Sequence, residues 1–329
     1  MDQPISPVPA SYLSRRDFLK ITAVSATAVA AGYFLGREGF HSLATYRESR
    51  LLMGTLVHLT AVDDYGKKAA AAVTATFAEM ERVIHLLDHR LPATPLARLN
   101  REGYLADAPP ELVEVVDTAI TYARLTAGAF DISVKPLLDH IKAGGAAAAF
   151  DRRLVDYRQI ELSGPAIRLG RPGMALTLDG LGKGYVVDKG TAALRSRGYA
   201  NILVEAGGDL VGCGRRADGT PWQIGIAHPR EAAVITQLPI SNQAAATSGD
   251  YQHYFSHDFR HHHIIDPRTG ESPPELASVT VTAPAAVDAD ALSTALLVLG
   301  LEDGLSLANR LPHVSALLVT KSLAIHHSG

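Results

Sequence analysis

Side chains able to do chemistry are concentrated between Ala246 and Gly270, in the stretch ATSGDYQHYFSHDFRHHHIIDPRTG. Hydroxyl, imidazole and guanidinium groups beside glycine amides are the groups that proteins use to bind phosphate. Three aromatic side chains, Tyr251, Tyr254 and Phe255, indicate a surface that accepts a flat ring. The stretch ends in Asp-Pro-Arg-Thr-Gly, which is typical of a turn. We hypothesise that this segment handles a phosphorylated ligand that carries a ring.

A glycine-rich stretch, LTLDGLGKGYVVD at residues 176–188, is the second candidate. Its pattern predicts a strand, a tight turn and a helix that ends at Gly198. Backbone amides at such a helix start, with the positive end of the helix dipole, bind anions. Lys183 lies in the turn and favours phosphate as that anion. The glycine spacing fits neither the dinucleotide fingerprint nor a Walker loop, so a generic tight turn stays open as the alternative.

A late helix, predicted from about Asp288 to Leu299, carries the third candidate. Asp290 and Thr294 are four residues apart and therefore share one face of this helix. A carboxylate and a hydroxyl are hard oxygen ligands that suit Mg²⁺. The alternative is that Asp288 or Asp290 caps the helix start while Thr294 is merely packed.

Hydrophobic periodicity predicts the elements that would position these residues. Strands are expected at 56–62, 222–227 and 278–283, and a further buried strand should precede the Gly-Gly-Asp turn at 207–209. Helices are expected at 67–87 and after Pro109-Pro110. The inward face of the second helix comprises Leu112, Val115, Val116, Ala119, Ile120 and Ala123. Residues 128–137 then combine a glycine, an aromatic and an acid, which could form one wall of a ligand pocket.

Composition narrows the class of protein. The chain has 329 residues, of which 47% are hydrophobic and 20% charged, as in an ordinary globular protein. Its net charge of -3 provides no overall basic field, which argues against a nucleic-acid partner. The single cysteine, Cys213, excludes an intramolecular disulfide and a thiolate zinc cluster.

The N-terminus has the pattern of an export signal. Paired arginines, Arg15 and Arg16, precede an apolar run from Ile21 to Leu35, which is the twin-arginine pattern of bacteria. The run is short for a membrane span, and a short membrane anchor or an amphipathic tail is the alternative. We therefore expect residues 1–40 to be a signal or anchor segment and the protein to be periplasmic or held at the outer face of the inner membrane. The folded domain is expected at 50–320.

Taken in order, a set of short motifs resembles the ApbE family, the FAD:protein FMN transferases. These motifs are Met53-Gly54-Thr55, Ala129-Phe130-Asp131, the turn from Gly180 to Asp188, Ala206-Gly207-Gly208-Asp209, Ala246 to Tyr251, His263 to Gly270, and Ala289 to Ala295. The resemblance covers about residues 51–318. It implies an α+β fold related to the T-fold, with mixed helices and a mostly antiparallel sheet.

The resemblance also implies an activity. Family members use Mg²⁺ to move the FMN half of FAD onto a threonine or serine hydroxyl of a target protein, through a phosphoester bond, and release AMP. Their targets are flavoprotein subunits of membrane-linked redox systems. Two alternatives stay open: an FAD pyrophosphatase that gives FMN and AMP, and a flavin-binding protein without catalysis.

The implied site residues fall into three groups. Those near FAD are Met53, Ala129, Phe130 and Asp131 at the flavin, and Asp179, Lys183, Tyr185, Thr247, His263 and Ile264 along the rest of the molecule. The metal would be held by Asp290, Thr294 and the carbonyl of Gly182. In catalysis, Lys183 would hold phosphate oxygens, and either His263 or Asp266 would take the proton of the acceptor hydroxyl.

This sequence departs from the family pattern at a few positions. Thr177 replaces an aspartate that is common in the glycine-rich turn, and Asp179 stands where glycine or asparagine is usual. Arg90 replaces an aromatic residue, which removes one ring-stacking contact. Within the histidine run, we expect His261 and His262 to be ordinary surface residues and assign a role to His263 alone.

Overall fold

The computed structural model describes residues 43–63 and 66–329. The expected twin-arginine segment therefore lies outside the described residues. Within the part of the chain that is described, no helix is both long enough and apolar enough to cross a membrane.

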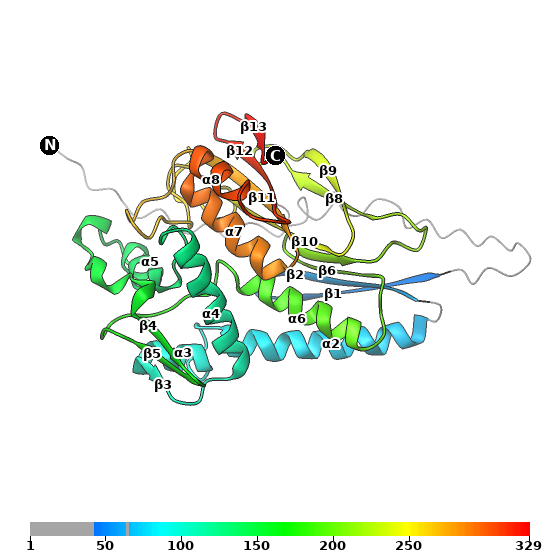
Figure 1. Ribbon diagram of the computed structural model, residues 1–329, viewed down its shortest axis with the longest axis horizontal. Coiled ribbons are helices and arrows are strands. Elements are labelled where there is room, and N and C mark those ends of the chain that lie inside the picture. Colours follow the sequence, from blue (N-terminus) through cyan, green and yellow to red (C-terminus); the bar gives the residue numbers. More distant parts are fainter. Residues whose placement is uncertain (1–42, 64–65) are drawn as a thin grey trace, which may run out of the picture.

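An eight-stranded sheet forms the centre of the molecule (Figure 1). Its order is β1-β2-β6-β7-β10-β11-β12-β13, and all neighbouring strands run antiparallel. The strands are β1 (Ala44–Leu52), β2 (Thr55–Asp63), β6 (Ile202–Ala206), β7 (Asp209–Cys213), β10 (Gln243–Gly249), β11 (Leu276–Ala283), β12 (Ser315–Thr320) and β13 (Ile325–His327). The predicted α+β class with a mostly antiparallel sheet is confirmed.

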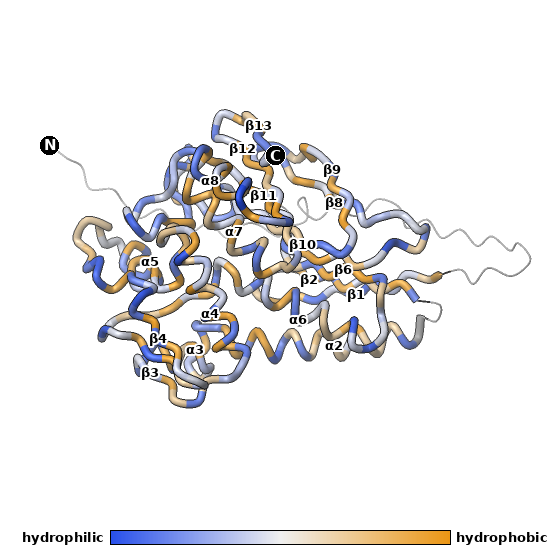
Figure 2. The backbone as a smooth tube through the Cα atoms, in the orientation of Figure 1, coloured by the Kyte–Doolittle hydropathy of each residue, from blue (hydrophilic) through white to orange (hydrophobic). Residues whose placement is uncertain are grey.

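Three helices pack against this sheet: α2 (Gly66–Leu87), α6 (Gly182–Ser196) and α7 (Ala286–Leu299). Helix α6 also packs against both α2 and α7. Helix α7 lies against β10 and β11, and α6 lies between α7 and α2 (Figure 1). Helix α8 (Leu301–Ala308) follows α7 directly. In Figure 2 hydrophobic and hydrophilic colours alternate along α2, as expected for a helix with one face in the core.

A smaller group of elements lies at the C-terminal end of α2, to the left in Figure 1. It contains α3 (Pro95–Glu102), α4 (Pro110–Leu125), α5 (Lys135–Lys142) and a three-stranded sheet of β3 (Tyr104–Leu105), β5 (Ala166–Leu169) and β4 (Ile160–Ser163). A separate hairpin is formed by β8 (Trp222–Ala227) and β9 (Val234–Ile240). The strand predicted at 222–227 and the buried face predicted for α4 are both confirmed.

The strand predicted at the start of the glycine-rich stretch is wrong, since residues 174–178 belong to no strand. The side-chain amide of Asn100 takes the place of a partner strand: its Nδ2 donates to the Leu176 carbonyl at 2.8 Å and its Oδ1 accepts the Leu176 N–H at 2.7 Å. The Thr177 N–H donates to the Ile132 carbonyl at 2.9 Å. These bonds satisfy an extended backbone without any ladder.

The central sheet extends past both expected limits of the domain at 50–320, since β1 begins at Ala44 and β13 ends at His327. Strand β1 pairs along its whole length with β2, and β13 pairs with β12.

Candidate functional site

Three charged side chains meet where α6, α7 and β7 converge. Lys183, at the start of α6, forms an ion pair with Asp209, the first residue of β7. Its Nζ also lies 4.0 Å from Oδ1 of Asp290 in α7. Both carboxylates are almost completely buried, with Asp209 1% and Asp290 3% exposed. The structure therefore brings together two of the predicted site residues, Lys183 and Asp290, and adds a third.

Burial dominates the electrostatics of this cluster. Together with the nearby Asp290 carboxylate, it raises the pKa of Asp209 to about 7 against the opposing influence of Lys183. Burial would lower the pKa of Lys183, but the charges of Asp209 and Asp290 outweigh it and hold that pKa above its ordinary value. A buried pair of carboxylates beside a single ammonium group favours a further cation.

Asp209 had no predicted role, although the sequence carried a signal for it. The residue follows a Gly-Gly turn at the end of a buried strand, and Gly207 and Gly208 both have positive φ, 58° and 103°. A side chain at Gly207 would lie 2.6 Å from Oγ1 of Thr55, so the turn fits closely against the β1–β2 turn. Predicting the ion pair itself required knowing that α6 passes over this turn.

The close crossing of α6 and α7 brings Asp290 next to the start of α6. A Cβ atom at Gly184 would lie 2.2 Å from the Ala286 carbonyl oxygen, so α6 meets the start of α7 at a distance that only glycine allows. The Gly184 N–H, near the start of α6, donates to Oδ2 of Asp290 at 3.0 Å. This amide, predicted to bind an anion, therefore already has a carboxylate as partner.

The predicted alternative for α7, capping by Asp288 or Asp290, is wrong. The cap comes from Asp188 on α6, whose carboxylate accepts the N–H groups of Ala286 at 2.8 Å and Val287 at 2.9 Å. Asp288 accepts the Tyr122 hydroxyl instead, at 2.7 Å. Because another helix supplies the cap, Asp290 remains available to the cluster.

Thr294 lies one turn beyond Asp290 and belongs to a hydroxyl group network. Its Oγ1 is 3.0 Å from Oγ of Ser248 on β10, which is also 2.8 Å from Oγ of Ser293. The glycine-rich turn closes over it, since a Cβ atom at Gly180 would lie 3.7 Å from that Oγ1 and 3.0 Å from the Phe130 ring.

The predicted metal donors come from two helices that touch, α6 and α7. Asp290 and Thr294 share a face of α7, and Gly182 begins the helix whose Gly184 contacts Asp290. Among the described residues, no group of three or more His, Cys, Asp or Glu side chains could hold a metal ion. The donors would be one carboxylate, one hydroxyl and one carbonyl, so substrate phosphate and water must complete the shell, as is usual for Mg²⁺.

The predicted flavin wall is a tightly bonded loop. Ala129, Phe130 and Asp131 are buried, and the Asp131 carboxylate accepts hydrogen bonds from nearby backbone amides. Asp131 Oδ1 accepts the Ser133 N–H at 2.8 Å, and its Oδ2 accepts the Tyr157 N–H at 3.0 Å. Burial raises the pKa of this carboxyl. Met53, with a φ of 51°, is half-buried in the β1–β2 turn.

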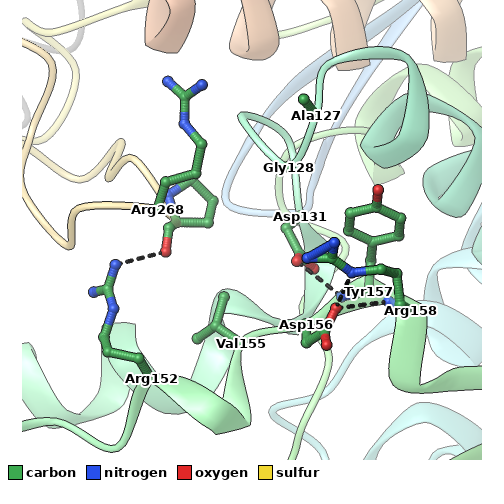
Figure 3. Close-up of a pocket in the computed structure, with 10 residues that line it drawn as sticks. Ala127, Gly128, Asp131, Arg152, Val155, Asp156, Tyr157, Arg158 and Arg268 are labelled. Carbon is green, nitrogen blue, oxygen red and sulfur yellow. Dashed lines mark hydrogen bonds and ion pairs between the residues drawn. The ribbon is translucent and has the colours of Figure 1, made fainter.

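A cavity of about 260 Å³ opens beside this loop (Figure 3). Asp131 lines it together with Arg158, and Arg268 lies on the opposite side in Figure 3. Pro267 also lines the cavity. Arg152 lies on the same side as Arg268 in Figure 3 and donates to the Pro267 carbonyl at 2.9 Å. None of the lining residues belongs to the cluster of Lys183, Asp209 and Asp290.

Tyr185 points away from the cluster. Residues two apart on a helix do not face the same side, and the Tyr185 hydroxyl donates to Glu114 of α4 at 2.7 Å. Its predicted place near FAD thus has no support from its neighbours. Two departures from the family pattern, by contrast, contact each other: Arg90 Nη2 lies 3.0 Å from Oδ1 of Asp179.

The two predicted bases, His263 and Asp266, differ in how their side chains are bonded. Its ring Nδ1 lies 3.1 Å from the His253 carbonyl, and burial lowers the pKa of its imidazole to about 4, although Asp179 acts against this. The ring is therefore neutral at physiological pH. Asp266 is committed to its own turn, since it accepts the Arg268 N–H at 2.8 Å and pairs with the Arg268 guanidinium at 2.9 Å. Between the two predicted bases, the geometry favours His263.

Two further residues predicted to lie near FAD, Thr247 and Ile264, contact other parts of the protein. Thr247 on β10 bonds with Thr280 of β11 at 2.8 Å between the Oγ1 atoms, and Ile264 is buried in the main core. The expectation that His262 is an ordinary surface residue is wrong, because His262 is 0% exposed. Its backbone N–H donates to Oγ of Ser272 at 2.9 Å, and its ring Nε2 lies 3.3 Å from the Pro273 carbonyl, while His261 stays exposed.

Comparison with known proteins gives one consistent result. The model of the ApbE family matches residues 53–318. The FAD:protein FMN transferase of Salmonella typhimurium is 32% identical over 279 residues, which cover 78% of this chain and 79% of the Salmonella protein. The FAD:protein FMN transferase of Treponema pallidum is 29% identical over 312 residues, 83% of this chain and 84% of that protein.

Solved structures that are similar to this chain also come from ApbE proteins. The crystal structure of the ApbE protein of Thermotoga maritima superposes with a TM-score of 0.77 at 27% identity, over 87% of this chain and 97% of the other. The flavinyl transferase ApbE of Pseudomonas stutzeri, in its apo form, gives a TM-score of 0.76 at 26% identity, over 89% and 97% of the two chains.

Proposed function

The chain belongs to the ApbE family, and on this premise we propose that it transfers the FMN half of FAD to a threonine or serine hydroxyl of a target protein. A phosphoester bond forms between the hydroxyl oxygen and the FMN phosphorus, and the pyrophosphate bond to AMP breaks. The observation that carries this proposal is the buried Asp290 beside Lys183, one helical turn from Thr294.

Each side chain has a defined task in this reaction. Lys183 neutralises non-bridging phosphate oxygens, which is what phosphoryl transfer requires of a protein. His263, neutral because burial lowers the pKa of its imidazole, accepts the proton of the attacking hydroxyl. Asp290, Thr294 and the Gly182 carbonyl would hold Mg²⁺, which polarises the phosphorus and stabilises AMP as the leaving group.

We further propose where and on what the enzyme acts. The twin-arginine pattern at Arg15-Arg16 supports export to the periplasm or to the outer face of the inner membrane. An acceptor in that compartment fits a flavoprotein subunit of a membrane-linked redox system. The family resemblance supports this class of partner.

Transfer can be tested with purified protein, FAD, Mg²⁺ and a candidate acceptor subunit. A covalent fluorescent flavin band on the acceptor, absent when its target hydroxyl is replaced by alanine, is expected. A protein that binds FAD and Mg²⁺ but only releases AMP and FMN in the presence of acceptor would be a hydrolase, and the proposal would be wrong.

A further inference from the structure

A buried ion cluster lies outside the site described above, at the base of the loop from Asp250 to His263. Asp250 directly follows β10 and is 0% exposed. Arg230 binds it with both guanidinium nitrogens, Nη1 to Oδ1 at 2.7 Å and Nη2 to Oδ2 at 2.8 Å. Lys321, just after β12, brings its Nζ to 3.7 Å from Oδ2. One buried carboxylate thus holds two cations from different parts of the chain.

Arg230 and Lys321 both contact Phe259, a residue of the same loop. The Arg230 guanidinium carbon lies 4.0 Å from the centre of the Phe259 ring, and Lys321 Nζ donates to the Phe259 carbonyl at 2.7 Å. Phe259 has a φ of 58°, a left-handed conformation that a large side chain adopts only when its surroundings hold it there. The cluster supplies that constraint.

Phe259, held by these two cations, is connected to His263 through contacts within the loop. The Phe259 ring contacts the Tyr254 ring at 4.7 Å between centres, and Tyr254 forms a β-bridge with His262. One residue further along each side of the loop, the His263 N–H donates to the His253 carbonyl at 2.9 Å. A continuous chain of contacts therefore connects Asp250 to the His263 imidazole.

We propose that Asp250 is a positioning residue for flavin transfer, which holds Arg230 and Lys321 so that Phe259 and its loop present His263 to the glycine-rich turn. The part that concerns catalysis rests on the proposed function. The part that concerns the loop does not, because the environment of His263 can be measured in the enzyme alone.

The test compares Asp250→Asn with the wild type, using Asp117→Asn, an exposed carboxylate on α4, as the matched control. Asparagine keeps the shape but not the charge that binds both cations. We expect kcat for transfer to fall by roughly tenfold or more while KM for FAD stays within about threefold, since misplaced groups chiefly affect the reacting geometry. Asp117→Asn should match the wild type.

The second readout is the titration of the His263 imidazole, followed by NMR in the free enzyme. The charged or titratable groups that face this ring are His253, His262 and Asp179. A loosened loop admits water, so in Asp250→Asn the midpoint should move upward from the low wild-type value. A residue that only stabilised the fold would lower the melting temperature and leave both the kcat and this midpoint unchanged, and that outcome overturns the proposal.

Phe259→Leu covers the case in which Asp250→Asn does not fold. Leucine removes the ring on which Arg230 stacks and leaves the buried ion cluster intact. The same upward shift of the His263 midpoint is expected, and a wild-type midpoint in this variant overturns the proposal. If the wild type transfers no flavin at all, the proposed function fails, while the two titrations still decide whether Asp250 places the loop.

Discussion

At the scale of single residues, Asp290 decides how the site works. One carboxylate oxygen accepts the Gly184 N–H at 3.0 Å, and the other faces the Lys183 ammonium group at 4.0 Å. Its neighbour Asp209 has a raised pKa because it is buried beside this second carboxylate. The cluster therefore combines a helix amide, one ammonium group and two carboxylates. Under the proposed function it would receive a phosphate together with Mg²⁺.

Asp290→Asn should lower kcat for flavin transfer by at least about 10²-fold, because the only carboxylate in the expected metal set becomes neutral. FAD binding, measured by quenching of flavin fluorescence, should persist. Asp288→Asn is the matched control, since this neighbour on α7 bonds to the Tyr122 hydroxyl and not to the cluster. Transfer by Asp290→Asn within a few-fold of the wild-type rate would contradict the assignment.

The pH dependence of transfer should reflect the low pKa of the half-buried His263 imidazole. Burial lowers the pKa of His263 to about 4, so the neutral, proton-accepting form prevails at every pH above that value. We expect kcat to stay level as the pH falls from 7 to about 5 and to decline only below that, in line with this low pKa. His263→Gln should reduce kcat and remove the acid limb. An acid limb centred at the ordinary histidine value would show that the ring is exposed during the reaction.

At the scale of elements, the crossing of α6 and α7 assembles the site. Gly184 lets the helices touch, Asp188 caps α7, and Asp290 returns a hydrogen bond to α6. The residues in contact are spread from 184 to 290 in the sequence, and their meeting depends on the close approach that Gly184 allows. The contact at Gly184 therefore fixes both the distance between the two helices and the position of the Asp290 carboxylate.

Gly184→Ala should disrupt this crossing, because the added Cβ would lie 2.2 Å from the Ala286 carbonyl oxygen. We expect a loss of about 3 kcal/mol or more in the free energy of unfolding, typical of severe overpacking in a core. Gly182→Ala is the matched control, since its Cβ would only touch Leu178 at 3.5 Å. Equal denaturant midpoints for the two variants would show that the helices can separate without cost.

Some elements could be predicted from local pattern and others could not. The buried face of α4 and strand β8 follow from apolar spacing alone. Strand β10, with the sequence QAAATSG, lacks β-branched residues at its centre, and it is a strand because β7 and β11 pair with it on both sides. The inward position of His262 likewise belongs to the assembled fold, in which its ring Nε2 lies 3.3 Å from the Pro273 carbonyl.

At the scale of the whole molecule, one sheet and its helices bring together distant parts of the chain. The candidate site takes Lys183 from a helix, Asp209 from a strand start and Thr294 from a late helix. Motif order allowed Lys183, Asp290 and Thr294 to be predicted as site residues, but their contacts with Asp209 and Ser248 needed the assembled fold. Charge type can be read from a sequence, whereas proximity cannot.

Export should depend on the paired arginines. Replacing Arg15 and Arg16 with lysines should leave the protein in the cytoplasm, because the twin-arginine route reads that pair. The measurement is the share of the protein in the periplasmic fraction of the native host. A variant that still reaches that fraction at the wild-type level would show that another route exports the chain.

The most direct test of flavin transfer counts its two products. FAD, Mg²⁺, the enzyme and an acceptor subunit are mixed, and AMP released is compared with flavin bound covalently to the acceptor. The transferase account predicts one AMP for each flavin transferred, and neither product with Asp290→Asn. Release of AMP without covalent flavin on the acceptor would contradict it.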